Sequence, residues 1–218
     1  MYRLFAKDYT VYLFDRRPTA HPGITVREMA ADVAAAMDAL GLSSADILGV
    51  SQGGMIAQYL AIDRPDLVRR MVLAVTLARN NPTVSDVIGR WITLTEEGRM
   101  RELVRDMAER MYSAAYLRRY RPLLPLLTLL QKPRDADRFV TLACACLTCD
   151  TYDLLDKITC PVLVLGGGED KIVTPDASRE IAERLAAPLT LYEGLGHAAY
   201  EEARDFNRRV YDFFREEL

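Results

Sequence analysis

The sequence has little of what a nucleic-acid or membrane protein needs. Its 28 basic and 31 acidic side chains leave a formal net charge of only -3, so no basic surface for nucleic acid or for an anionic membrane is indicated. No basic segment followed by an apolar core opens the chain, and no stretch approaches the roughly 20 uninterrupted apolar residues of a membrane span. We therefore expect a cytoplasmic protein whose partners include neither nucleic acid nor membrane.

Cysteine is also scarce, with four among 218 residues. Three of them, Cys144, Cys146 and Cys149, are crowded together, and Cys160 follows. This spacing could indicate a metal site, but on a helix the first two side chains would point about 160° apart. No histidine lies nearby, so we expect buried reduced thiols and no metal.

The composition is sufficient for a hydrophobic core. Half of the residues are hydrophobic and 27% are charged, which is ordinary for a soluble globular protein. A chain of this length can form one sizeable core, or one core with an inserted subdomain. No internal repeat or low-complexity linker is present.

Strand and helix patterns alternate up to about residue 79. Strands are expected at Tyr9–Asp15, Ile47–Val50 and Arg70–Thr76. Between the first two, Thr25 and Glu28 form a capping box that opens a helix ended by Gly41, and a second helix runs from the second strand to about Asp63. This alternation predicts a parallel sheet, in which active sites lie at the carboxyl ends of the strands.

From about residue 80 to 156 the pattern is helical throughout. Helical segments are expected at Val84–Leu94, Met100–Tyr112, Tyr116–Leu130 and Phe139–Leu147, with breaks at Pro122, Pro125 and Pro133. We interpret this stretch as an insertion over the strand ends that roofs an apolar pocket. Its arginines between residues 99 and 121 could attract an acidic substrate, but a solvated helix face is the better interpretation. The chain then divides into a first core part, 1–79, a helical cap, 80–156, and a second core part, 157–218.

Strand and helix patterns resume in the second core part. A strand is expected at Pro161–Leu165, and a capped helix opens at Thr174 with Pro175 in its first turn. Leu189–Tyr192 is a last short strand before a final helix. These elements extend the sheet that the first core part begins.

Ser51 has the setting of a nucleophile. It lies between Gly49 and Gly53 in a G-x-S-x-G pattern, where a buried strand turns into a helix. Small residues are needed there because the serine backbone is strained while strand and helix pass close on either side. The N–H groups and positive dipole end of the helix also suit an oxyanion. The simpler alternative is a Gly-rich turn with an incidental serine.

Asp170 and His197 could complete a catalytic triad with Ser51. A serine hydroxyl is a weak nucleophile that needs a base, and the base needs an orienting carboxylate. His197 follows the last strand in a Gly-rich loop, while the chain's second histidine, His21, is expected to be exposed. Two further acids, at positions 169 and 176, compete with Asp170, which is favoured because only a short loop separates it from its strand.

Together these motifs resemble the α/β-hydrolase superfamily. The similarity rests on Gly49–Gln58, Pro161–Gly166, Glu169–Val173 and Gly194–His197. It covers nearly the whole chain, and the helical insertion matches the family's cap domain. Within the superfamily, the sequence is most similar to small bacterial hydrolases grouped with 3-oxoadipate enol-lactonases and carboxylesterases. The resemblance implies an α/β-hydrolase fold, with a mostly parallel sheet and helices on both faces.

The resemblance also implies roles for individual residues. Ser51 would be the nucleophile, His197 the general base and then acid, and Asp170 the orienting acid, while the backbone N–H of Gln52 would be one oxyanion donor. We expect a serine hydrolase that cleaves an ester or lactone of a small apolar substrate through an acyl-enzyme, without a cofactor or metal. Hydrolysis of a carbon–carbon bond by the same triad stays open.

One part of the family's fold has no counterpart in this sequence. In the family, three strands and a helix precede the strand expected here at Tyr9–Asp15, and a loop after the third of them supplies the second oxyanion N–H. That third strand lies between the strands at Tyr9–Asp15 and Ile47–Val50, so its absence would leave central backbone groups unpaired. Three outcomes are open: the sequence is a fragment of a longer protein, the two strands close up into a five-stranded sheet, or another chain fills the gap. We expect a truncated ancestral hydrolase whose sheet closes up or is completed by oligomerisation, as a homo-oligomer.

Because the segment without a counterpart supplies an oxyanion N–H in the family, the sequence also permits a second function. The alternative is a catalytically impaired remnant, or a small-molecule binding protein, that lacks a complete oxyanion hole. A structural Rossmann-like domain is disfavoured because no G-x-G-x-x-G follows the first expected strand.

Overall fold

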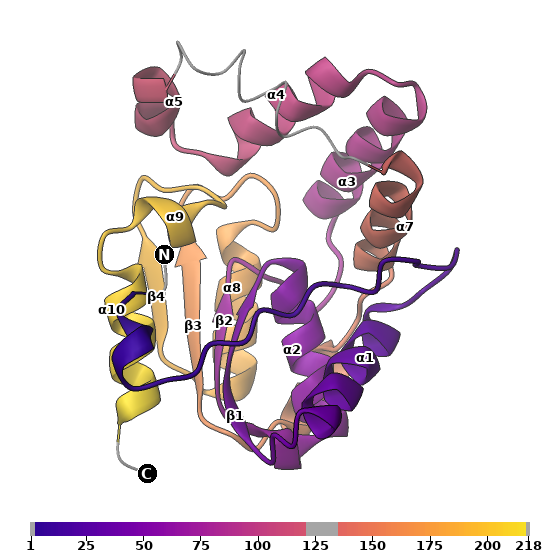
Figure 1. The fold of residues 1–218 in the computed structure, drawn as a ribbon. Coiled ribbons are helices and arrows are strands. Elements are labelled where there is room, and N and C mark those ends of the chain that lie inside the picture. Colours follow the sequence, from indigo (N-terminus) through magenta and orange to yellow (C-terminus); the bar gives the residue numbers. More distant parts are fainter. Residues whose placement is uncertain (1–2, 121–134, 217–218) are drawn as a thin grey trace.

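A parallel sheet of four strands forms the centre of the molecule (Figure 1). The computed structural model describes residues 3–120 and 135–216, and all statements of structure concern these ranges. The strands lie side by side in chain order as β1 (Ala45–Val50), β2 (Val68–Ala74), β3 (Val162–Gly167) and β4 (Leu189–Tyr192). Because every neighbouring pair is parallel, the carboxyl ends of all four strands meet along one side of the sheet.

Helices cover both faces of this sheet. One hydrophobic cluster joins the sheet to α1 (Val26–Ala39), α2 (Gln52–Asp63) and α8 (Pro175–Leu185). A second cluster, on the opposite face, joins it to η1 (Phe5–Lys7), α9 (Ala199–Glu202) and α10 (Phe206–Arg215). The short helices η2 (Pro65–Leu67) and η4 (Tyr152–Lys157) are connectors. The fold is the α/β arrangement that the alternating sequence pattern predicts.

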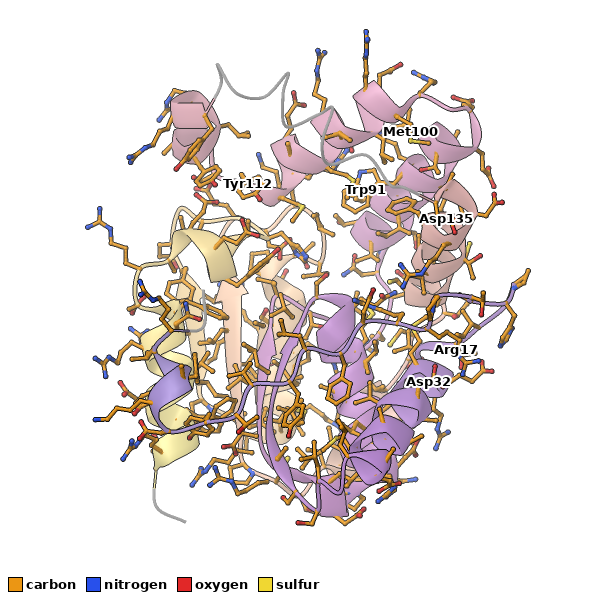
Figure 2. The ribbon with its side chains drawn as sticks, viewed as in Figure 1. Arg17, Asp32, Trp91, Met100, Tyr112 and Asp135 are labelled. Atoms are coloured by element: carbon orange, nitrogen blue, oxygen red, sulfur yellow. The ribbon has the colours of Figure 1, made fainter. Side chains whose placement is uncertain are left out.

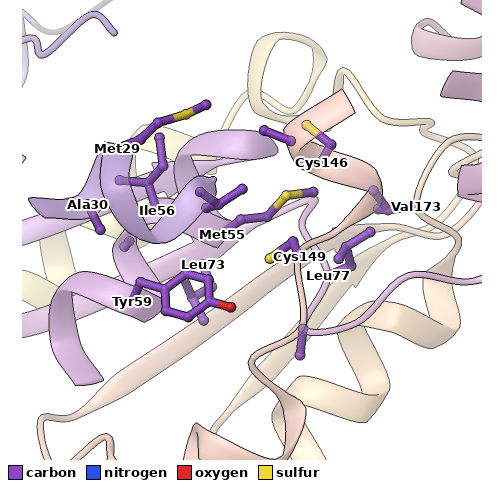
Figure 3. Close-up of a cluster of buried hydrophobic side chains, with 14 of the residues drawn as sticks. Met29, Ala30, Met55, Ile56, Tyr59, Leu73, Leu77, Cys146, Cys149 and Val173 are labelled. Atoms are coloured by element: carbon purple, nitrogen blue, oxygen red, sulfur yellow. The ribbon is translucent and has the colours of Figure 1, made fainter. Parts of the chain in front are cut away.

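The core is densest around β2 and α2. Met71, Val72, Leu73 and Ala74 are completely buried, as expected for a strand that is covered by helices on both faces. Figure 3 shows the side chains of α1 and α2 packing against those of β2 and against two cysteines of the cap. This core fixes the start of α2, where Ser51 lies.

The predicted side-chain cap at the start of α1 is confirmed, but the one predicted at the start of α8 is wrong. Thr25 and Glu28 form the expected capping box, in which the Glu28 N–H donates to Thr25 Oγ1 and the Thr25 N–H donates to Glu28 Oε2. At α8, however, the Thr174 side chain accepts no capping hydrogen bond within the described residues. Its backbone has a φ of 71°, and Pro175 alone provides the helix-start signal there.

The segment expected to form the cap, residues 80–156, contains the helices α3 (Pro82–Glu96), α4 (Met100–Met111), α5 (Ala114–Tyr120) and α7 (Ala136–Leu147) and keeps the name cap. Figure 1 places α4 and α5 beyond the carboxyl ends of the strands, and Figure 2 labels Trp91 of α3 and Tyr112, which directly follows α4. Asp106 of α4 accepts hydrogen bonds from Trp91 and from two arginines of the cap. The three prolines predicted as breaks and the end of the segment expected at Tyr116–Leu130 lie outside the described residues.

The strand expected at Tyr9–Asp15 is absent, and that prediction was wrong. The N-terminal segment, Tyr9–Arg16, is extended but pairs with no strand of the described chain. A cavity of about 660 Å³, the edge cavity, separates it from β1. The aromatic and β-branched composition favours a strand, but a strand exists only where a neighbour pairs with it. The expected closure into a five-stranded sheet was therefore also wrong.

The cysteines only partly follow the expectation of buried thiols. Cys146 and Cys149 are buried and Cys160 is half-buried, but Cys144 is exposed, and all four are free. Burial raises the pKa of the Cys146 thiol to about 11 and that of Cys149 to about 12, so both are neutral at pH 7. Among the described residues no cluster could hold a metal ion. Neither does the described part contain a helix that is long and apolar enough to cross a membrane.

Candidate active site

Ser51 occupies a strained turn between β1 and α2. Its φ of 53° and ψ of -122° are unusual for any residue other than glycine. Two hydrogen bonds to the end of β2 hold this conformation: the Ser51 N–H donates to Ala74 O at 2.9 Å, and Thr76 Oγ1 donates to Ser51 O at 2.7 Å. The sheet therefore fixes the direction in which the serine hydroxyl points.

The glycines around Ser51 do not all do what the motif predicts. A Cβ at Gly49 would lie 2.7 Å from Gly53 O and 2.7 Å from Gly54 Cα, so β1 and α2 do pass too close for a side chain there. A Cβ at Gly54 would lie 2.6 Å from the Thr76 side chain. At Gly53 it would meet nothing within 4 Å, and Gly53 instead lines the edge cavity. The close approach thus involves Gly49 and Gly54, and the expectation for Gly53 was wrong.

This difference gives a matched pair of substitutions. Gly49→Ala should lower the free energy of unfolding by about 1–3 kcal/mol, because its methyl group must push backbone atoms apart. Gly53→Ala should change it by less than about 1 kcal/mol, because the added methyl meets no atom and alanine favours a helix. Urea denaturation followed by circular dichroism measures both. Equal losses from the two variants would contradict this account of the turn.

The structure brings Ser51, His197 and Asp170 together in one chain of hydrogen bonds. His197 Nε2 lies 2.9 Å from Ser51 Oγ, and His197 Nδ1 lies 2.8 Å from Asp170 Oδ2. The Asp170 Oδ1 atom accepts hydrogen bonds from the backbone N–H groups of Ile172, at 2.8 Å, and Val173, at 3.1 Å. The His197 and Asp170 side chains are only 4% and 2% exposed. Both oxygens of the carboxylate are thus occupied, and the imidazole is held between two partners.

The loops that carry Asp170 and His197 are in close backbone contact. Asp170 follows β3 and His197 follows β4, so both side chains come from carboxyl ends of strands, as does Ser51 after β1. A Cβ at Gly167 would lie only 2.1 Å from Gly196 O, directly before the histidine. The loop is also attached to the cap, because the Ala198 N–H donates to Met111 O at the end of α4.

The competing residues lie away from this cluster. The Asp176 side chain is 88% exposed and pairs with Arg179, and Glu169 is exposed as well. His21 is exposed, as expected, and its Nε2 lies 3.3 Å from Glu28 Oε1 on the surface of α1. Of the acids considered from the sequence, only Asp170 bonds to His197 in the described structure.

The side chain of Gln52 makes contacts that sequence reasoning missed. Its Nε2 donates to Leu142 O at 2.8 Å and lies 3.0 Å from Cys146 Sγ, both in α7. Its Oε1 accepts from Arg16 Nε at 2.9 Å. The residue next to the serine therefore links the N-terminal segment, the turn and the cap. No local pattern could reveal these contacts, since the partners lie 36 to 94 positions away.

The backbone N–H of Gln52 is placed for an oxyanion. It is the first residue of α2, where the N–H groups have no acceptor within the helix and the helix dipole is positive. None of the described residues accepts a hydrogen bond from this N–H group. An anionic oxygen formed beside Ser51 could therefore bind to it.

Comparison with known proteins identifies the family to which this fold belongs. The model of the alpha/beta hydrolase family matches residues 1–209. The pimeloyl-[acyl-carrier protein] methyl ester esterase of Neisseria meningitidis is 32% identical over 183 residues, which are 78% of this chain and 69% of that protein. The crystal structure of an enol-lactonase from Burkholderia xenovorans has a TM-score of 0.81 and 26% identity, covering 90% of this chain and 76% of its own.

A second solved structure shows the same fold. MGS-M2, an alpha/beta hydrolase from a deep-sea metagenome library, has a TM-score of 0.82 and 25% identity, covering 92% of this chain and 75% of its own. The family match spans nearly the whole chain, and the relatives include an esterase and a lactonase. The chain belongs to the α/β-hydrolase family.

Proposed function

We propose that this protein is a serine hydrolase that cleaves an ester or lactone of a small apolar substrate through an acyl-enzyme. The observation that carries the proposal is the unbroken hydrogen-bond chain from Ser51 through His197 to Asp170. The names of the relatives, an esterase and an enol-lactonase, support the class of bond. The proposed roles are those of the Ser-His-Asp triad.

In the first half of the proposed reaction, His197 Nε2 takes the proton of Ser51 as Oγ attacks the carbonyl carbon. Asp170 holds the imidazole in the required tautomer and stabilises the imidazolium that forms. The oxyanion of the tetrahedral intermediate accepts the hydrogen bond of the Gln52 N–H. The intermediate collapses when His197 gives its proton to the leaving alkoxide, which leaves the acyl group on Ser51.

In the second half, water replaces the alcohol. His197 removes a proton from the water as its oxygen attacks the acyl carbon, and a second tetrahedral intermediate forms. Collapse of this intermediate returns the proton to Ser51 Oγ and releases the carboxylic acid. The free enzyme is thus restored without any cofactor.

The preference for an apolar substrate is argued from α7, which borders the turn. Leu142 and Cys146 contact the Gln52 side chain, so this part of the cap lies beside the serine. Burial keeps the Cys146 thiol neutral at pH 7, and the Leu142 side chain, whose backbone oxygen accepts the bond from Gln52, packs against the hydrophobic core. An uncharged acyl group is therefore the better match for this wall.

The alternative is a catalytically impaired hydrolase, or a protein that binds a small molecule without turnover. One observation favours it: the edge cavity reaches Gly53 and Arg16 beside the turn, so no backbone of the described residues fills this side of the turn. Loss of one oxyanion donor typically costs about 10²- to 10³-fold in kcat. A weak hydrolase and a non-catalytic protein then differ in whether Ser51 reacts at all.

Labelling with a fluorophosphonate probe tests the proposal. This reagent mimics the acylation step, so we expect one label per chain, which peptide mass spectrometry locates at Ser51. Heat-denatured protein and the Ser51→Ala variant are the controls and should remain unlabelled. Hydrolysis of short p-nitrophenyl esters and of simple lactones then identifies the preferred bond. A folded protein that takes no label would favour the alternative.

A further inference from the structure

The loop that carries Asp170 ends in a strained residue. Thr174, directly before α8, has a φ of 71° and a ψ of 150°. The ψ value suits a residue that precedes proline, but a positive φ is unfavourable for a β-branched side chain and persists only where neighbouring groups hold it. The preceding residue is Val173, whose N–H donates to Asp170 Oδ1 at 3.1 Å. Relaxation of Thr174 would therefore disturb a group that holds the Asp170 carboxylate.

The side chain of Asn81 holds the peptide bond in front of Thr174. Its Nδ2 donates to Val173 O at 3.1 Å. This oxygen belongs to the peptide unit that joins Val173 to Thr174, and the φ of Thr174 decides how that unit is turned. Rotation of Thr174 to a negative φ would swing the oxygen away from Asn81. The hydrogen bond from Asn81 therefore opposes the relaxation of the loop.

The amide group of Asn81 is oriented by a second contact. Asn81 is the N-cap of α3, where its Oδ1 accepts from the Val84 N–H at 2.9 Å. With a donor on one side and the Val173 oxygen on the other, the two partners decide which way the amide points. Serine and aspartate cap a helix as well as asparagine does, but aspartate has no donor and the serine hydroxyl reaches less far. The contact with the loop is what asparagine adds at this position.

The segment that leads to Asn81 is anchored in the core. Leu77 and Ala78, which follow β2, are completely buried. The carbonyl oxygen of Leu77 accepts from Gln58 Nε2 at 2.9 Å, and that of Ala78 accepts from the Thr151 N–H at 2.6 Å. The Asn81 side chain thus extends from a fixed backbone, and can hold the loop in place.

We propose that Asn81 is a positioning residue for Asp170. This role rests on the proposed function, in which Asp170 orients His197. By holding the peptide unit between Val173 and Thr174, Asn81 keeps the strained loop in the form that aims two backbone N–H groups at Asp170 Oδ1. Because Asn81 belongs to the cap, the cap helps to set the position of the catalytic acid.

Asn81→Ser tests the proposal because it removes the donor to Val173 and keeps a helix cap. We expect kcat with a p-nitrophenyl ester to fall at least about tenfold, since small displacements of reacting groups are costly. KM should stay within about threefold, because the change acts on the acid and not on the bound substrate.

Asp135→Ser is the matched control for this variant. It makes the same kind of change at the N-cap of α7, where Asp135 accepts from the Arg138 N–H and bonds to no triad loop within the described residues. We expect its kcat to stay within about twofold of wild type. Losses of similar size in the two variants would overturn the proposal.

Thr174→Gly separates positioning from helix capping. Glycine adopts the φ of Thr174 without strain, so the loop then needs the bond from Asn81 much less. In the Thr174→Gly protein, Asn81→Ser should therefore cost less than about threefold in kcat, and the two changes should not be additive. If Asn81 served only to cap α3, its replacement would cost the same in both backgrounds. Equal costs would overturn the proposal.

Proton NMR follows the imidazole without any turnover. The buried proton that His197 Nδ1 donates to Asp170 gives a signal far downfield, and its loss in Asp170→Asn assigns it. Asn81→Ser should shift or broaden this signal, while Asp135→Ser should leave it unchanged. If the folded wild type takes no fluorophosphonate label and cleaves no ester, the proposed function fails, and the response of this signal still decides the role of Asn81. A signal that Asn81→Ser leaves unchanged would overturn the positioning role alone.

Discussion

Asp170→Asn is expected to lower kcat by about 10⁴-fold while the fold is kept. The reason lies in the two backbone N–H groups of Ile172 and Val173, which donate to Asp170 Oδ1. An asparagine must place its single oxygen there, so its NH₂ group faces His197 Nδ1. The imidazole then carries its proton on Nε2, beside Ser51, and cannot accept the hydroxyl proton.

The control for this variant is Asp176→Asn. Asp176 was a competing acid in the sequence, but its side chain is 88% exposed on α8 and pairs only with Arg179 among the described residues. We expect its kcat to stay within about twofold of wild type, since surface changes of this kind have small effects. Initial rates with a p-nitrophenyl ester and the rate of fluorophosphonate labelling measure both variants. A fall of similar size in both would refute the assignment of the acid.

Local sequence patterns predicted the elements whose stability is decided locally. The capping box at Thr25 and Glu28 starts α1 because the contacts that form it lie within one turn. Residues Val162–Gly167 form β3 because an apolar run bounded by Pro161 and glycines can only be buried. The segment Tyr9–Asp15 has an equally strong strand composition but forms no strand. Pairing depends on a neighbour, and the segment's own sequence does not contain that information.

In the candidate site, too, features with a local sequence signature were predicted, and features that depend on distant residues were not. The G-x-S-x-G pattern predicted the turn at Ser51 because a strained turn between strand and helix has a local signature. The pairing of His197 with Asp170 needed the order of the strands, which the alternation pattern supplied. The Gln52 contacts with Arg16 and Cys146 could not be predicted, because they depend on how the cap and the N-terminal segment meet the turn. The open space at Gly53 was missed for the same reason.

These differences share one cause, the edge cavity. It separates the N-terminal segment from β1, leaves Gly53 without a neighbour, and lets Arg16 reach across to Gln52. Each of these features lies between elements that are distant in the chain. Filling the cavity would alter all three, while the hydrogen bonds among Ser51, His197 and Asp170 involve none of the residues in these three features.

Gly167→Ala tests whether the close contact between two loops sets the position of His197. A methyl group at Gly167 would lie 2.1 Å from Gly196 O and 2.7 Å from the Gly196 carbonyl carbon. Both are backbone atoms, so the loop that carries His197 must move away from β3. A displacement of about 1 Å can cost about 10²-fold in rate, and we expect kcat to fall at least that much.

The matched control for this variant is Gly168→Ala, one residue along the same chain. Its methyl group would lie 3.2 Å from atoms of Glu193 and from Tyr192 O, which requires shifts of only a few tenths of an ångström. We expect a loss in kcat of less than about tenfold, because a shift that small disturbs the reacting geometry far less than one of 1 Å. Thermal unfolding shows whether either variant loses the fold, and initial rates show the displacement of the histidine. Full activity in a folded Gly167→Ala protein would mean that the His197 loop tolerates movement, and that its attachment to Met111 in the cap, more than its contact with β3, holds the imidazole beside Ser51.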